Sequence, residues 1–263
     1  MKRFIKKRLL QLVPVLIGIT FLSFVLVNMS NTDAIDMLEA NRGTAMTEVE
    51  KQELREELGL NKPVITRYFI WLKNTFTGDM GNSYVSGKPV FSTFVSKLPA
   101  TVYLCVVSMA LTLIISVPLG IISAVNKNKW LDYIIRVVSL IGNSNFFLAL
   151  LLIYVFALKL NWLPVMGNRA GAKSVILPSV TLAVAMSSRY ISQIRTAVIN
   201  ELDKPYVNGA RARGVSEGTI LIRSVLKSAM LTVSTLLALS AGSLLGGTAI
   251  VESIFMWDGV GKM

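Results

Sequence analysis

The 263-residue sequence contains no histidine and a single cysteine, and only 16% of its residues are charged. Without an imidazole, Ser-His-Asp and Cys-His catalysis are excluded. The lone Cys105 cannot form an intrachain disulfide or a Cys-x-x-Cys metal clip, so we expect a small buried hydrophobe. No G-x-x-x-x-G-K-[ST] motif occurs, so nothing predicts nucleotide binding through a P-loop. We therefore expect a protein that is not an enzyme and that needs neither a cofactor nor a metal.

Long hydrophobic runs dominate what is present. Hydrophobic residues make up 53% of the sequence, and four stretches carry no charge: residues 9–32, 98–126, 137–158 and 228–251. A soluble domain is about 45–50% apolar and about 25% charged, whereas a membrane-spanning helix needs about 20 mostly apolar residues. The composition excludes a soluble protein and predicts an all-α polytopic membrane protein.

Five spans are predicted, over residues 9–29, 100–125, 137–158, 176–198 and 228–251. Residues 1–8 are basic and contain no acid, which places the N-terminus in the cytoplasm because positive flanks stay inside. A cleaved signal peptide is disfavoured, since its apolar region is usually about 7–15 residues and ends in an A-x-A-like site. The formal net charge is +12, but the basic residues flank the apolar runs and form no stripe with interleaved aromatic residues, so binding to nucleic acid is not expected.

The sequence divides into three parts. Residues 1–29 hold the cytoplasmic N-terminus and first span, residues 30–99 an external and partly helical segment, and residues 100–263 the transmembrane core with a cytoplasmic loop at 200–227. In the external segment, Thr47 and Glu50 form a capping box, and Gly59 is placed to end the helix that follows. Tyr68, with Phe69 and Trp71, suits a short helix at the membrane interface.

Several residues in the spans are unusual. Pro118 and Gly120 are expected to interrupt the second span, and Gly242, Gly246 and Gly247 form a small-xxx-small surface in the fifth. In the fourth span, Arg195 lies near an end and is expected to snorkel, whereas Arg189 either snorkels or faces a polar path. Glu252 could meet substrate or a binding protein, or it could be a solvated interface residue.

The loop after the fourth span is the most informative segment. Pro205 should end that span, Tyr206 to Arg213 predict a short helix, and Gly214 should stop it. Ser216 can begin another helix leading into the fifth span. By composition alone this could be an ordinary basic loop that holds the topology or a surface shaped for docking.

The order of residues favours docking, because the loop resembles the coupling loop of binding-protein-dependent ABC importer permeases of the peptide and nickel branch. The matching pattern is Tyr206-Val207-x-x-Ala210-Arg211-Ala212-x-Gly214. Asn208, Gly209 and Ala210 occupy the E-A-A positions of the family motif, with Asn208 in place of its Glu. Ser224 and Lys227 stand where the general motif has Ile and Pro. Contacts attributed to that Glu therefore do not transfer.

The resemblance extends along almost the whole chain. It includes the basic start, Gly-Asp-Met-Gly-x-Ser at 78–83, Leu-Pro-Ala-Thr at 98–101, the segments 156–164 and 176–178, and the segment 251–261. It implies the type I ABC importer permease fold. Members of the branch usually continue through a sixth span, so we expect that this chain shows five spans and lacks the sixth by C-terminal truncation.

The resemblance also implies the function: a permease subunit in the bacterial cytoplasmic (inner) membrane that translocates dipeptides, oligopeptides, or nickel or a metal chelate. Its implied partners are ABC ATPase subunits that supply the free energy, a second homologous permease, an extracytoplasmic substrate-binding protein and the lipid bilayer. The residues implied in ATPase coupling are Tyr206, Ala210, Arg211, Ala212 and Gly214. Candidates for the translocation path are Asn143, Ser144, Asn145, Ser240 and Ser243, with Ser234 and Thr235, although hydroxyls in spans often bond their own helix.

Two other classes remain as alternatives. A self-sufficient secondary transporter or channel tends to show inverted repeats or paired ionisable groups within spans. The sequence has no internal repeat and no acid in its charge-free runs. A membrane-bound enzyme is disfavoured by the absence of histidine and of a clustered carboxylate pair.

Overall fold

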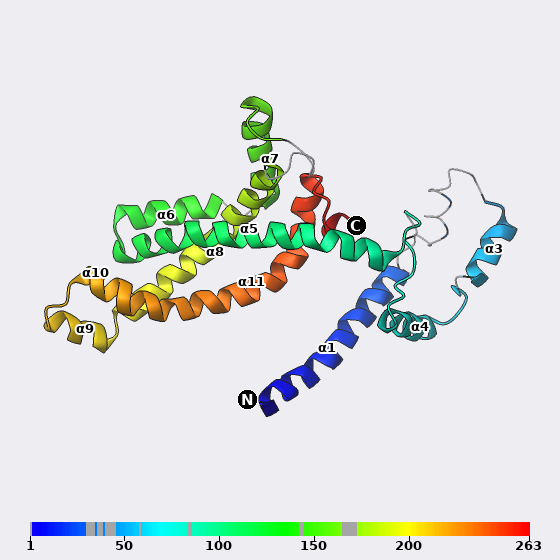
Figure 1. Cartoon of the computed structure of the whole chain (residues 1–263), viewed down its shortest axis with the longest axis horizontal. Helices are drawn as coiled ribbons and strands as arrows, with labels where there is room; N and C mark the ends of the chain where they lie inside the picture. Colours follow the sequence, from blue (N-terminus) through cyan, green and yellow to red (C-terminus); the bar gives the residue numbers. More distant parts are fainter. Residues whose placement is uncertain are drawn as a thin grey trace. The chain divides into compact units, whose positions relative to one another are not determined.

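The computed structural model describes residues 2–29, 35, 39, 46–57, 59–83, 86–141, 145–164 and 173–263, and it places most of them in helices (Figure 1). The chain forms two compact units, Met1–Phe94 and Val95–Met263. Within the described residues, four helices are long and apolar enough to cross a membrane: Lys6–Met29, Val90–Val125, Lys173–Leu202 and Glu217–Gly246. The predicted all-α class is confirmed, and the count of five spans stays a prediction.

The first unit contains α1 (Lys2–Met29), α3 (Glu48–Glu57) and α4 (Val64–Phe76). The helix α3 begins with the predicted capping box. The backbone N–H of Thr47 donates to Glu50 Oε2 over 2.8 Å, and the N–H of Glu50 donates to Thr47 Oγ1 over 3.4 Å. The chain leaves α3 through Gly59, whose φ of +66° is in the left-handed region that glycine tolerates. Both local predictions are confirmed.

The helix α4 packs on α1 through an aromatic contact. Tyr68 is 2% exposed, and its ring centroid lies 5.1 Å from that of Phe21 and 5.7 Å from that of Phe24. Its hydroxyl donates to the carbonyl oxygen of Ile17 over 3.2 Å. The short helix is thus as predicted, but Tyr68 is used for helix packing, while its neighbour Phe69 is exposed.

The second unit contains most of α5 (Val90–Val125) and all of the elements that follow. These are α6 (Trp130–Ile141), α7 (Asn145–Leu152) with a π-helical continuation (Ile153–Lys159), α8 (Ile176–Leu202), α9 (Pro205–Ala212), α10 (Glu217–Thr219), a π-helical segment (Ile220–Val225), α11 (Leu226–Ile254) and a 3₁₀ turn (Val260–Lys262). The helix α8 contacts α6, α7 and α11, so it lies at the centre of this unit. In Figure 1, α9 and α10 lie together at the end of the unit where α11 begins, far from the 3₁₀ turn.

Two predicted features differ in the structure. The third span, predicted as one helix over 137–158, is divided between α6, which ends at Ile141, and α7, which begins at Asn145. The second span is not interrupted, because Pro118 lies inside a continuous 36-residue α5. Hydropathy counts apolar residues but does not report where the backbone turns, which explains the first difference.

Close approach between helices occurs at Gly120, not at the glycines of α11. A Cβ added to Gly120 would lie 2.7 Å from Cγ2 of Ile194, so only a hydrogen atom fits between α5 and α8 here. Around Gly242 and Gly246, nothing else in the described chain lies within 4 Å of such a Cβ. Two glycines of the predicted small-residue surface, Gly242 and Gly246, therefore make no close contact with the described part of the chain.

A buried cluster joins the ends of α8, α9 and α11. Its members are Ala124, Tyr190, Ile194, Val198, Val207, Ile220, Val225, Ala229 and Val233. Val198, Val207 and Val225 are each 0% exposed. Because the short helix α9 contributes to this cluster, its position depends on the long helices before and after it.

Candidate functional site

The helix α9 has well-defined ends. Before it, Lys204 is extended (φ −74°, ψ 147°), and Pro205 occupies the first turn, where a missing N–H costs nothing. After it, the N–H of Gly214 donates to the Arg211 carbonyl over 2.9 Å, and the N–H of Val215 donates to the Ala210 carbonyl over 3.2 Å. This pair of bonds is a Schellman motif, and the φ of +77° at Gly214 supplies the left-handed residue it requires. The predicted short helix and its glycine stop are confirmed.

One face of α9 is anchored in the protein. Val207 is fully buried, and Ala210, three residues later on the same face, is half-buried against the cluster that joins α8, α9 and α11. The alanine side chain lets α9 lie close to its neighbours. Any displacement of α9 must therefore press on α8 and on the segment that leads into α11.

The opposite face is open. Tyr206, Arg211, Ala212 and Gly214 are exposed. The Tyr206 hydroxyl donates to Glu201 Oε1 over 3.0 Å, and Lys204 Nζ lies 2.6 Å from Glu201 Oε2. The hydrogen bond to Glu201 raises the pKa of Lys204 above that of an ordinary lysine. These contacts fix the junction between α8 and α9.

Arg211 is held by two side chains of its own loop. Its Nε and Nη2 donate to the carboxylate of Glu217 over 2.6 and 3.2 Å, and Nη1 donates to Asn208 Oδ1 over 3.2 Å. The pair crosses the turn between α9 and α10 and is largely exposed. Exposed pairs add only about 0–1 kcal/mol of stability. Its consequence is geometric, because the two-pronged bond sets the direction of the guanidinium.

The structure thus brings the five predicted coupling residues together on α9 and its C-terminal cap. Ala210 faces inward, and Tyr206, Arg211, Ala212 and Gly214 face outward. Sequence reasoning used Val207 only as part of the family pattern and Glu217 only as a start of the next helix, and it gave no role to Glu201. The spacing of Val207 and Ala210 was a usable signal, because apolar residues three apart share a helix face.

Only part of the predicted translocation path lies within the described residues. Asn143 and Ser144 lie outside the described residues, and Asn145 is described only as the backbone start of α7. On α11, Ser240 is buried, while Ser243 is exposed and donates to the Ser240 carbonyl over 3.1 Å. Ser234 and Thr235 both donate to the Leu231 carbonyl. These three donating hydroxyls bond within their own helix, and the path stays a prediction.

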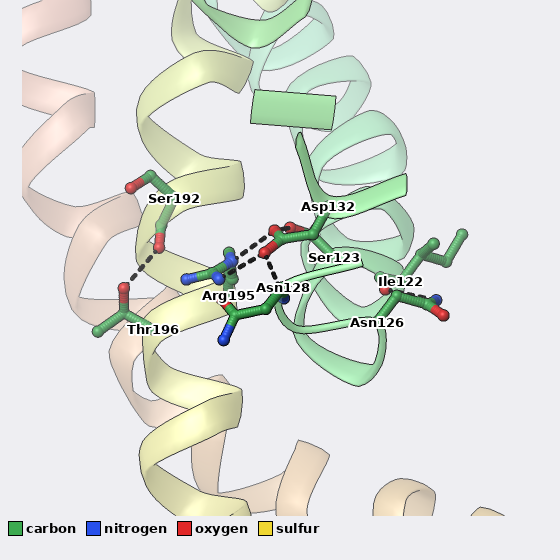
Figure 2. A network of polar contacts seen from close by, with 8 residues as sticks. All are labelled: Ile122, Ser123, Asn126, Asn128, Asp132, Ser192, Arg195 and Thr196. Carbon is green, nitrogen blue, oxygen red and sulfur yellow. Dashed lines mark hydrogen bonds and ion pairs between the residues drawn. The ribbon is translucent and has the colours of Figure 1, made fainter. Parts of the chain in front are cut away.

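A buried ion pair joins α6 to α8, the helix that precedes α9 in the chain. Arg195 of α8 donates from Nε and Nη2 to the two carboxylate oxygens of Asp132 on α6, each over 2.7 Å (Figure 2). Asp132 is fully buried, and the Arg195 side chain is 18% exposed. The prediction that Arg195 snorkels to water is wrong. A signal existed: Asp132 is the only acid in residues 126–136, and an arginine in a span calls for a partner.

This pair has an expected dependence on pH. The hydrogen bond from Arg195, helped by those from Ser123 and Asn128, holds the pKa of Asp132 well below its usual range, against the raising effect of burial. A carboxyl group whose pKa is lower in the folded state than in the unfolded state stabilises the fold. This stabilisation is complete at a pH above the unfolded-state pKa of about 3.9, and it is lost as the pH falls toward the folded-state pKa.

We therefore expect the difference in melting temperature between the wild type and Asp132→Asn, measured in mild detergent, to stay constant from about pH 8 to about pH 5 and to shrink below about pH 4. Asp258→Asn, which changes an exposed carboxylate that pairs with Lys97 over 3.1 Å, serves as the comparison. A difference that already declines between pH 7 and pH 5 would show that Asp132 titrates near its ordinary pKa.

Glu252 occupies a second buried polar site, at the C-terminal end of α11. It is 0% exposed, and its carboxyl group accepts hydrogen bonds from Thr101 Oγ1 over 2.7 Å and from the N–H of Gly261 over 2.6 Å. The alternative that Glu252 is a solvated interface residue is wrong. Its oxygens connect α5, at Thr101, to the 3₁₀ turn that follows α11.

Comparison with known proteins gives the family. Residues 116–263 match the binding-protein-dependent transport system inner membrane component, and residues 1–105 match the N-terminal membrane component of these systems. The chain is 34% identical over 265 residues to the glutathione transport system permease protein GsiC of Escherichia coli (strain K12), covering 100% of this chain and 85% of that protein. It is 34% identical over 275 residues to the oligopeptide transport system permease protein AppB of Bacillus subtilis (strain 168), covering 100% and 86%.

These matches confirm the resemblance seen in the sequence motifs, and they describe a transport component, not an enzyme. Inner-membrane membership agrees with the four apolar helices long enough to span a bilayer in the described part of the chain. A binding-protein-dependent importer works with ATPase subunits and a substrate-binding protein. The chain therefore belongs to the family of binding-protein-dependent transport system inner membrane components, and it is a multi-pass permease subunit of an ABC importer in the cytoplasmic membrane.

Proposed function

We propose that this permease translocates short peptides and that α9 is the element through which the partner ATPases drive it. Relatives named for glutathione and for oligopeptides support a peptide substrate. Nickel or a metal chelate is the alternative cargo within the same branch. The chain has no nucleotide site of its own in this proposal, so the free energy for transport comes from the partner subunits.

One observation carries the coupling role: α9 exposes one face while Val207 and Ala210 anchor the other in the cluster shared by α8 and α11. A partner bound to the exposed face can push on both long helices at once. Tyr206, Arg211, Ala212 and Gly214 supply the surface and the cap, and Ala210 supplies the close fit.

The rest of the assembly follows from this placement. The N-terminus lies in the cytoplasm beside its basic residues 1–8, which puts α9 on the side where ATP is available and residues 30–99 outside. A second, homologous permease completes the pathway. Asn143, Ser144, Asn145, Ser240 and Ser243 remain the candidate lining.

Gly214→Ala tests the proposal without removing any side-chain contact. A Cβ at Gly214 meets nothing within 4 Å, so the substitution acts only through its φ of +77°. A left-handed conformation costs a non-glycine residue about 1–2 kcal/mol. At about 1.4 kcal/mol for each factor of ten, we expect roughly five- to thirtyfold less ATPase subunit retained on the purified permease and a matching fall in peptide uptake.

Gly209→Ala is the matched control, because Gly209 lies in α9 without a positive φ and also has nothing within 4 Å of the added Cβ. Alanine is also the family residue at this position. Uptake is measured in cells that express the complete importer, with labelled glutathione, a labelled tetrapeptide and a nickel chelate as probes. Equal ATPase retention by both variants would refute docking through α9, and uptake of the nickel chelate alone would refute the peptide substrate.

A further inference from the structure

The carboxylate of Asp132 connects three elements of the second unit. Besides the two bonds from Arg195 of α8, it accepts a hydrogen bond from Ser123 Oγ over 2.5 Å and another from the N–H of Asn128 over 3.1 Å. Figure 2 shows Ser123, Asn128 and Arg195 converging on Asp132. Ser123 lies in the last turns of α5, and Asn128 lies in the turn before α6, so four bonds on one side chain join α5, α6 and α8.

Stability alone is a weak explanation for such a pair. Moving two charges out of water can cost as much as their attraction returns, and hydrophobic replacements of buried pairs are often neutral or stabilising. A two-pronged arginine–carboxylate bond does fix the relative orientation of the two side chains, because both N–H···O bonds form only at one relative position. The Asp132–Arg195 pair therefore fixes the position of α6 against α8.

The pair also lies next to the junction that carries α9. Ile194, adjacent to Arg195, fills the space left by Gly120 of α5, and Val198, one turn further on, packs in the cluster that holds Val207 of α9. A force applied to α9 thus reaches α8 within two turns of Arg195. Whether α5 and α6 move together with α8 depends on the contacts that hold them to α8 near Arg195.

We propose that Asp132 and Arg195 are positioning residues that make the ends of α5, α6 and α8 move as one body when the partner ATPases displace α9. This inference rests on the coupling role proposed for α9. It deepens that role by stating which helices follow the coupling helix and which contact makes them follow.

The test is a distance measured between α6 and α8 in the assembled importer. Spin labels are placed by Val138→Cys on α6 and Gln193→Cys on α8, both at exposed positions, in a background where the single native Cys105 is replaced by alanine. Double electron–electron resonance then compares the nucleotide-free complex with the complex trapped by ATP and vanadate. A rigid joint predicts the same narrow distance distribution in both states.

Arg195→Lys keeps the positive charge beside Asp132 but removes the two-pronged bond. In this variant we expect the distribution to broaden and to differ between the two nucleotide states, with less peptide transported per ATP hydrolysed. Ser123→Ala should change the distribution in the same direction by a smaller amount. Ser108→Ala is its matched control, because Ser108 is equally buried on α5 and donates to Leu104 of its own helix.

Two results would overturn the inference: a wild-type distance that shifts with nucleotide, or an Arg195→Lys distance identical to the wild type. If Arg195→Lys does not assemble, the comparison of Ser123→Ala with Ser108→Ala decides. ATPase retention is measured in each preparation. Loss of retention by Gly214→Ala concerns the docking role of α9, whereas altered α6–α8 distances with normal retention concern the Asp132–Arg195 pair alone.

Discussion

Replacing Glu252 with alanine is expected to lower the free energy of unfolding by about 3 kcal/mol, because it leaves one buried and one half-buried donor without an acceptor at about 1–3 kcal/mol each. Those donors are the hydroxyl of Thr101, which is 2% exposed, and the N–H of Gly261. For a unit of this size the loss corresponds to a fall in melting temperature of about 6–12 °C. The measurement is the melting temperature of the purified permease in mild detergent.

The effect should be large because Glu252 organises a connected set of contacts. Thr101 Oγ1, which donates to Glu252, also accepts from the N–H of Val260 over 2.8 Å. The indole N–H of Trp257 donates to the Ala100 carbonyl over 3.2 Å. Without the carboxyl group at its centre, the segment after α11 loses hydrogen bonds that attach it to α5 at Thr101.

Two variants distinguish the loss of the hydrogen bonds to Glu252 from a general destabilisation caused by any substitution at the end of α11. Glu252→Gln keeps the shape and one acceptor oxygen, so it should lose less stability than Glu252→Ala. Ser253→Ala, next in the chain, removes an exposed hydroxyl that donates to Ala249 of the same helix, so it should melt like the wild type. If Glu252→Ala melts within a degree or two of Ser253→Ala, the hydrogen bonds to Glu252 do not support the fold.

The features that were predictable from sequence are those set by near neighbours in the chain. The capping box at Thr47 and Glu50 and the helix stops at Gly59 and Gly214 each depend on residues a few positions apart. Such geometry is determined by local φ, ψ and hydrogen-bonding choices. The same holds for the start of α9 at Pro205, and for this reason the candidate coupling helix could be placed before the structure was known.

The two buried carboxylates could not be placed in this way. The partners Asp132 and Arg195 are 63 residues apart, and Thr101 and Glu252 are 151 residues apart. From sequence, each charged group lies beside an apolar run, and its local surroundings suggest water or an interface. Only the packing of α5, α6, α8 and α11 shows that the same groups face one another.

The boundary between α6 and α7 shows the corresponding limit for spans. Apolar residues continue from α6 into α7, and a hydropathy window treats them as one helix. The structure describes α6 up to Ile141 and α7 from Asn145 as two helices. In contrast, Pro118 predicted a break that α5 does not make, because a long packed helix can tolerate a proline when neighbouring groups compensate.

Gly120→Ala is expected to lower the free energy of unfolding by about 2 kcal/mol, although alanine is the better helix former by about 1 kcal/mol. The added Cβ would lie 2.7 Å from Cγ2 and 2.8 Å from Cβ of Ile194, and 3.3 Å from the Ile191 carbonyl oxygen. The nearest atoms belong to a β-branched side chain close to its backbone, and Ile194 is 1% exposed. Because its rotamers are few and its surroundings are filled, relief requires α5 and α8 to move apart.

Gly242→Ala is the matched control for this prediction, because Gly242 lies in the long helix α11 and nothing else lies within 4 Å of an added Cβ. In purified permease, Gly242→Ala should raise the melting temperature slightly, through helix propensity, while Gly120→Ala lowers it by about 4–8 °C. Moving α5 away from α8 also strains the nearby Asp132–Arg195 bond, so Gly120→Ala should broaden the α6–α8 distance distribution even where Asp132 and Arg195 are intact. A Gly120→Ala protein as stable as Gly242→Ala would mean that α5 and α8 are not in contact at this point.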